Sequence, residues 1–271
     1  MQKLLQTALA AATLFVVGCQ QGEERQPPAD APEPEAHAPR LPTVEQPMDR
    51  ASLLQAVAAA ASAAGLGRDD GAAQRKLDGK TFEVRIRFAC EMPTQGAGTA
   101  APFGVSFEDE RRTLRVRAAP DLTIKDPAVA QVAGESVEGV EGFWMRRPWL
   151  LSDGCPAAAP EPAGNAGPVA VPPSGQRVGL AEFYVSTDSR IGRRKGRPFE
   201  ATLTLPAGEQ PSRQGYNLVL SGRLRQLGSG RVVSCRIADR DVPPECIVSA
   251  EFDHVWIEHP QTHAIIAEWT S

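Results

Sequence analysis

The spacing of hydrophobic and polar positions changes near residue 80, from a helical period to the two-residue period of β-strands. Residues 48–64 repeat apolar side chains at helical spacing in an alanine-rich run that Gly65 can end, and they predict a helix. Residues 70–79 predict a second, short helix. Residues 82–90 alternate apolar and charged side chains, which is typical of a half-buried strand.

Most of the remaining chain also reads as strands. Residues 102–119 predict a hairpin around a charged turn at 108–111, and residues 126–134 allow a short helix that Asp126 caps. Further strands are expected at 178–186, 199–206, 216–227, 231–238, 246–258 and 263–269, with a hairpin turn at 228–230 between two of them. Because strands that follow one another through short turns favour antiparallel pairing, we expect a mainly β (α+β) fold, with an N-terminal helix on an antiparallel sandwich or barrel-like domain.

Two segments interrupt this pattern and set the domain boundaries. Residues 20–47 are rich in proline and acid and contain few large apolar side chains, so they predict an unfolded tether. Residues 152–177 form a long Pro/Gly/Ala loop, which we interpret as an insertion within one domain rather than a junction between two. The expected organisation is a signal peptide at 1–18, a tether at 19–47 and a β-rich domain at 48–271.

The first residues have the layout of an export signal. Lys3 precedes an apolar run at 4–17, which is shorter than the ~20 residues that a membrane-spanning helix needs. The run ends in Val16-Val17-Gly18-Cys19, which resembles the lipobox of bacterial lipoproteins.

The resemblance implies that the chain is cut before Cys19 and that acyl chains on this cysteine anchor it to a membrane. It implies a place in the bacterial cell envelope, facing the periplasm. Gln20, where this family commonly has aspartate for inner-membrane retention, favours the outer membrane. A plain signal peptide followed by an incidental cysteine is the alternative.

Four further cysteines, Cys90, Cys155, Cys235 and Cys246, lie in the expected domain. An even number in an exported chain favours two disulfides, for which three pairings are open. The short turn-rich spacing between Cys235 and Cys246 favours a local bond, which leaves Cys90 with Cys155. Zinc is the rival ligand, but the chain has no Cys-x-x-Cys pair. We expect no cofactor.

The net charge of −4 gives no reason to expect nucleic acid as a partner, but the arginines are patterned. Arginines at every second position of a strand share one face, and a basic loop follows at 190–197. Such a surface predicts binding of an anionic polymer, unless the arginines pair with cross-strand acids such as Glu251 and Asp253. The strand pairs are Arg85/Arg87, Arg115/Arg117 and Arg223/Arg225, and the loop contributes Arg190, Arg193, Arg194, Lys195 and Arg197.

Three histidines near the end of the chain are candidates for chemistry. His259 and His263 flank a predicted turn, with Glu258 beside them, and these are ligand types for a metal. With His254 they also suggest a hydrolase, although no Gly-x-Ser-x-Gly motif is present and no catalytic nucleophile can be assigned. A solvated polar turn is the simpler interpretation.

The sequence therefore predicts a membrane-anchored envelope lipoprotein, non-catalytic, whose disulfide-bonded β domain binds a protein or an anionic polymer. The alternative is a periplasmic hydrolase or metal-dependent enzyme built on the C-terminal histidines.

Overall fold

The computed structural model describes residues 45–90, 101–146, 154–155, 177–188, 193–239 and 241–270, all within a unit that begins at Glu45. The predicted signal peptide, Cys19, the tether as far as residue 44 and most of the loop at 152–177 lie outside these residues. Within the described ranges, no helix is long and apolar enough to cross a membrane.

The described unit is mainly β, as the sequence predicts. Its helices are α1 (Arg50–Gly65), α2 (Gly71–Leu77) and α3 (Pro127–Ala133). Its strands are β1 (Thr81–Phe88), β2 (Phe103–Glu108), β3 (Thr113–Ala118), β4 (Val137–Arg146), β5 (Arg177–Val185), β6 (Phe199–Thr204), β7 (Tyr216–Leu224), β8 (Val233–Arg236), β9 (Glu245–Glu258) and β10 (Ile265–Thr270).

Local sequence explains the first elements. Asp49 caps α1 by accepting a hydrogen bond of 2.8 Å from the Ser52 amide, and the helix buries Leu53 and Val57 against the sheet. Buried and half-buried residues alternate along β1, as its period predicts. The hairpin expected at 102–119 is confirmed by the antiparallel pairing of β2 with β3.

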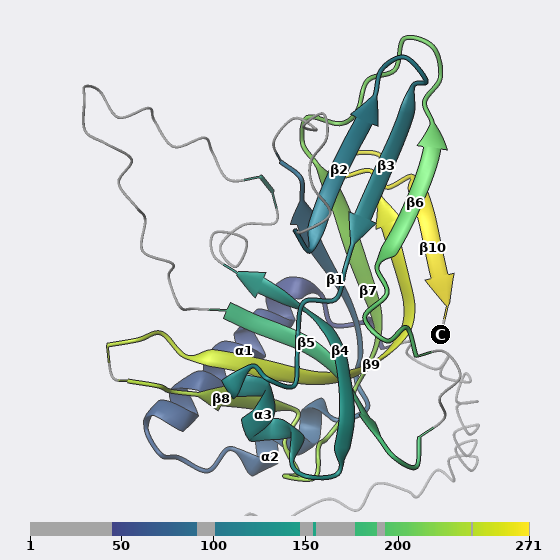
Figure 1. Cartoon of the computed structure of the whole chain (residues 1–271). Helices are drawn as coiled ribbons and strands as arrows, with labels where there is room; N and C mark the ends of the chain where they lie inside the picture. Colours follow the sequence, from purple (N-terminus) through teal and green to yellow (C-terminus); the bar gives the residue numbers. More distant parts are fainter. Residues whose placement is uncertain are drawn as a thin grey trace, which may run out of the picture. The chain divides into compact units, whose positions relative to one another are not determined.

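The long strand β9 organises the larger, seven-stranded sheet (Figure 1). Along one edge it pairs with β8 and then β7, and along the other edge it pairs with β5 and then β10. The register shifts between Ser221 and Gly222, which leaves Asp253 as the extra residue of a bulge. Gly222 is required there, because a Cβ atom would lie 1.9 Å from the Glu251 carbonyl oxygen. On the opposite edge of β9, the bulge lies between Ser249, where pairing with β5 ends, and His254, where pairing with β10 begins.

Three features of this topology differ from the expectation. The pairing of β5 with β9 is parallel, so the sheet is mixed rather than antiparallel. The turn at 228–230 joins β7 to β8, but these strands both pair with β9 and not with each other. The path of strands runs from β1 to β4 without closing, so the described domain is not a closed barrel. In each case partners distant in sequence decide the pairing.

A second sheet, in the order β2-β3-β6, packs on the first through a common core (Figure 1). Leu114 and Val116 of β3 belong to the same buried cluster as Phe143 of β4 and Leu218 of β7. The cluster also takes in the buried face of α1, whereas α3 covers a smaller cluster that contains Trp144. The two sheets therefore form layers around one hydrophobic interior.

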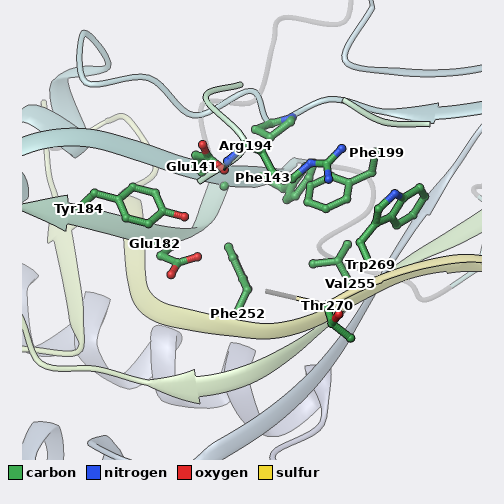
Figure 2. Close-up of a pocket in the computed structure, with 12 residues that line it drawn as sticks. Glu141, Phe143, Glu182, Tyr184, Arg194, Phe199, Phe252, Val255, Trp269 and Thr270 are labelled. Atoms are coloured by element: carbon green, nitrogen blue, oxygen red, sulfur yellow. Dashed lines mark hydrogen bonds between the residues drawn. The ribbon is translucent and has the colours of Figure 1, made fainter. Parts of the chain in front are cut away.

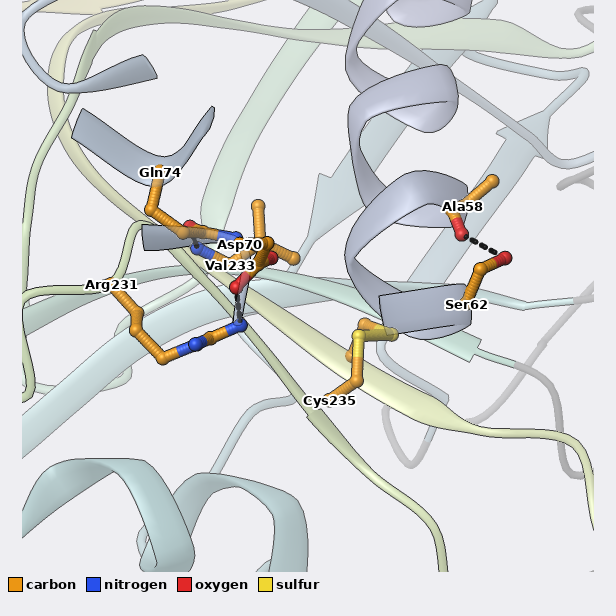
Figure 3. Close-up of a disulfide and its surroundings, with 8 residues drawn as sticks. Ala58, Ser62, Asp70, Gln74, Arg231, Val233 and Cys235 are labelled. Carbon is orange, nitrogen blue, oxygen red and sulfur yellow. Dashed lines mark hydrogen bonds and ion pairs between the residues drawn. A yellow bond between two sulfur atoms is a disulfide. The ribbon is translucent and has the colours of Figure 1, made fainter. Parts of the chain in front are cut away.

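Both expected disulfides are present. Cys90 is bonded to Cys155, and Cys235 is bonded to Cys246, which lies directly opposite it on the neighbouring strand. The second bond ties the short strand β8 to β9 beneath α1 (Figure 3).

The buried side chain of Gln74 on α2 completes the hydrogen bonding around β8 (Figure 3). Its Oε1 atom accepts hydrogen bonds from the amides of Val232 and Val233 at 3.0 and 2.9 Å. Its Nε2 atom donates to Asp70 at 2.8 Å. One side chain thus satisfies two buried backbone donors where β8 begins.

Replacing Gln74 by alanine is expected to lower the free energy of unfolding by about 2–4 kcal/mol, because two buried amides lose their acceptor. Urea denaturation of the full chain measures this loss. Gln261→Ala, at an exposed position of the turn after β9, is the control and should change stability by less than about 0.5 kcal/mol. Equal effects of the two substitutions would contradict the assigned role of Gln74.

Candidate functional site

The predicted arginine face is divided between the two sheets. Arg85 and Arg87 lie on β1 of the seven-stranded sheet, and Arg115 and Arg117 lie on β3 of the three-stranded sheet. Arg115 and Arg117 both pair with Glu200 on β6. The two arginine pairs therefore do not share one sheet face.

Arg223 on β7 and Arg225 just after it have the cross-strand acids that the sequence offers as the alternative. Arg223 lies 4.0 Å from Asp253, and Arg225 lies 2.5 Å from Glu251. Arg87 donates to the Gln214 carbonyl oxygen. Anion binding by these arginines stays a prediction, and an anion would have to compete with these internal contacts.

The described part of the basic loop is held against the domain. The guanidinium of Arg193 lies 4.6 Å from the Tyr184 ring centroid and donates to the Val185 carbonyl oxygen. The guanidinium of Arg194 lies 4.1 Å from the ring centroid of Phe199. The side chains of Lys195 and Arg197 are exposed. Arg190 lies outside the described residues.

The histidines do not gather around one cleft. His254 stacks on Trp256 with ring centroids 4.8 Å apart and pairs with Glu268. The rings of His259 and Tyr216 pack edge to face, and their centroids are 6.5 Å apart. Of the three histidines, His263 has the predicted carboxylate, that of Glu258, as a neighbour.

Glu258 is buried among four donors. Its carboxylate oxygens lie 2.9 Å from Arg85 Nε, 2.9 Å from Asn217 Nδ2, 3.1 Å from Trp256 Nε1 and 2.8 Å from His263 Nδ1. Burial alone would raise the pKa of Glu258, but these hydrogen bonds outweigh it and lower the pKa to about 2. The arrangement neutralises a buried charge and offers no open position.

The predicted metal ligands Glu258, His259 and His263 do not converge. Across the described part of the chain, no group of three His, Cys, Asp or Glu side chains could hold a metal ion. The metal interpretation of this turn is therefore not supported by its geometry.

A different group of residues lines a pocket between the two sheets (Figure 2). Glu141 on β4 and Glu182 on β5 stand directly opposite each other in the antiparallel register, so both side chains lie on one face of the sheet. Figure 2 shows Tyr184 and Glu182 on one side of the pocket, with Phe199 and Trp269 on the other. The pocket encloses about 50 Å³, which is room for a few water molecules or one small functional group.

Glu182 is the most perturbed acid in this pocket. Burial is the main cause that raises its pKa to about 7, with smaller contributions from the charges of Glu141 and Glu251. Hydrogen bonds with Tyr184 and with the Phe252 amide oppose this rise without cancelling it. Burial also raises the pKa of the Tyr184 hydroxyl, with Glu182 as the next cause, so this hydroxyl stays neutral. No cation among the described residues forms an ion pair with Glu182.

Glu141, which is more buried than Glu182, has different partners. Its carboxylate accepts hydrogen bonds from the backbone amides of Arg194, at 3.3 Å, and of Lys195. This buried acid therefore fixes the segment before β6, and the segment in turn forms one wall of the pocket.

The pocket exists because β5 and β9 separate. They pair only as far as Ala181 and Ser249, and β10 takes over that edge of β9 at His254. The gap between them forms an open groove of about 1000 Å³. Glu182 and Tyr184 line both the pocket and this groove, and Tyr184 also lines a third hollow of about 350 Å³ beside Arg193. The three hollows meet at the Tyr184 side chain.

Two acids in different environments can serve as an acid–base pair or as a binding site for a positive charge. Acid–base catalysis on a sugar or peptide would need the reacting centre between the two carboxyl groups. The space there is about 50 Å³, well below the roughly 300–1,000 Å³ of most small-molecule sites. Binding of one small charged group is the chemistry that fits this volume.

Sequence reasoning missed this pocket. Glu182 interrupts the apolar strand at 178–185, which is a signal that periodicity alone could have flagged. Its neighbours could not be foreseen, because β4, β5, β6 and β10 meet only through the sheet topology. The fold and the site together define a disulfide-bonded, mixed β domain with an acidic pocket between its two sheets. Comparison with family models, curated proteins and solved structures finds no match for this chain.

Proposed function

We propose that this protein is a lipid-anchored lipoprotein of the bacterial envelope whose β domain binds a partner at the pocket of Glu141, Glu182 and Tyr184. The lipobox-like ending at Cys19 supports the anchor, and two disulfides suit an oxidising compartment. The expected outer-membrane, periplasm-facing placement is part of this proposal.

The observation that carries the binding role is the placement of Glu182. A carboxyl group with a pKa of about 7 lies in a hollow without a cationic partner among the described residues. Such an arrangement opposes stability, and perturbed acids in hollows cluster at functional sites. The strand arginines, which the sequence suggested as an anion-binding surface, form ion pairs or hydrogen bonds with groups of the same chain. The pocket is therefore a better binding site than the arginine surface.

The anchor is tested by replacing Cys19 with serine. We expect the wild-type chain to incorporate labelled palmitate and to fractionate with membranes, because two or three acyl chains hold a protein firmly. The variant should lose both properties. Membrane fractionation of the Cys19→Ser protein at the wild-type level, or absence of label from the wild-type chain, would contradict the anchor.

The binding role is tested by photo-crosslinking in intact cells. A photoreactive residue at Gln131, an exposed position that lines the groove, should give a defined product that Glu182→Gln reduces at least fivefold. The same residue at Arg111, in the turn between β2 and β3, is the control and should not give that product. A product that is insensitive to Glu182→Gln would show that the pocket is not the binding site.

A further inference from the structure

We propose that the pocket binds an alkylammonium group, such as a lysine side chain or a small amine, with its charge between Glu141 and Glu182 and its carbon chain toward the groove. This inference rests on the proposed binding role and names the chemical class of the ligand.

The charges of the site favour a cation. Two acids face each other on neighbouring strands, and Glu251 on β9 adds a third negative charge near Glu182. A bound cation would offset the burial of Glu182 and its repulsion by Glu141. An anion would meet the same carboxylates and would add to that repulsion, which argues against an anionic ligand at this position.

The walls of the pocket also suit a cation. Phe143, Phe199, Phe252 and Trp269 line the pocket, and an aromatic ring can attract positive charge through its face. The chain provides its own example, because the Arg194 guanidinium lies 4.1 Å from the Phe199 centroid and 5.9 Å from the Trp269 centroid. That guanidinium donates to the carbonyl oxygens of Arg197 and Pro198, so it is not the counter-ion of Glu182.

The volume restricts the shape of the cation. About 50 Å³ accommodates an ammonium head group with its first carbon atoms, whereas a nucleobase or a sugar ring exceeds this space. The adjoining groove is much larger and is open, so a linear alkyl chain can continue into it. The tyrosine hydroxyl at the junction, which stays protonated, can accept a hydrogen bond from an ammonium group.

The test is calorimetric titration of the full-length protein in detergent with n-butylammonium, n-butanol and butyrate as probes. We expect n-butylammonium to bind at pH 8 at least tenfold more tightly than either of the other probes. Affinity should fall as the pH is lowered through 7, because Glu182 then takes up a proton. The other charged or titratable groups around Glu182 are Glu141, Tyr184, Glu251 and Arg194, with Arg193 over the Tyr184 ring. The adjoining groove adds Asp188, Arg225 and Asp253.

Two variants locate the binding. Glu182→Gln should weaken n-butylammonium binding at least tenfold and remove its dependence on pH near 7. Glu108→Gln makes the same chemical change at an exposed residue outside both the pocket and the groove, and it should alter the affinity less than threefold. Equal binding of n-butanol and n-butylammonium, or equal loss in both variants, would overturn the proposal.

Two more probes distinguish the two possible sources of the amine. Nα-acetyl-lysine methylamide represents a lysine of a partner protein, and putrescine represents a free amine. If one of these two probes binds more tightly than the other, and if Glu182→Gln weakens that binding, the result supports the alkylammonium site. The tighter probe then identifies the source of the amine. Absence of binding by all amines, together with a crosslink at Gln131 that still depends on Glu182, would refute this inference and leave the proposed binding role intact.

Discussion

Replacement of Glu258 by glutamine is expected to lower the free energy of unfolding by about 3–5 kcal/mol at pH 7, since it removes the charge at the centre of a buried network. Arg85 and His263 would lose the carboxylate that they face, and Asn217 and Trp256 would lose an ionised acceptor. Urea denaturation measures the loss. Glu251→Gln, whose side chain is half exposed and paired with Arg225, should reduce stability by no more than about 1 kcal/mol.

The effect of Glu258 should depend on pH with a definite sign. Its pKa lies at about 2 in the folded chain, below the ordinary value of 4.5, so the folded state favours the ionised form. The stabilisation is complete above about pH 4.5 and disappears as the pH falls toward 2. The wild-type chain and the Glu258→Gln variant should therefore differ most at neutral pH and converge in acid. A gap that stays constant from pH 7 to pH 2.5 would contradict this origin of the stability.

The contrast between Glu258 and the predicted histidine site shows which contacts could be predicted from the sequence. Spacing placed Glu258 and His263 near one turn, and they do lie 2.8 Å apart. Spacing could not reveal that Arg85 and Asn217 arrive from β1 and β7 to complete the network, because those contacts come from strand pairing. Neighbours along the chain were predictable, whereas the role of the acid depends on distant strands.

The same distinction applies to the fold. Periodicity located β1, the β2–β3 hairpin and α2, since each depends on its own residues. The disulfide between Cys235 and Cys246 was also predictable from a short separation in sequence. The parallel pairing of β5 with β9 was not, because more than sixty residues lie between the paired segments and local patterning carries no information on such partners. The pocket depends on that pairing and was missed for the same reason.

Replacement of Glu182 by glutamine should have the opposite effect to the Glu258 substitution, and it should stabilise the protein. The pKa of Glu182 is raised from 4.5 to about 7, so the folded state disfavours its ionised form. Its contribution to stability is fully present below about pH 4.5 and is lost as the pH rises through 7. At pH 8 the variant, which carries no charge to bury, should therefore be more stable by up to about 3 kcal/mol.

The pH profile distinguishes this cause from a general improvement in packing. At pH 3 the wild-type acid is protonated in both the folded and the unfolded state, so the two proteins should have nearly equal free energies of unfolding by urea denaturation. A difference that is the same at pH 3 and pH 8 would exclude the buried charge as its origin. If the variant is more stable at pH 8 and also loses amine binding, Glu182 opposes folding and favours a ligand through the same charge. A bound alkylammonium ion should then raise the stability of the wild-type chain at pH 8 and leave that of the variant unchanged.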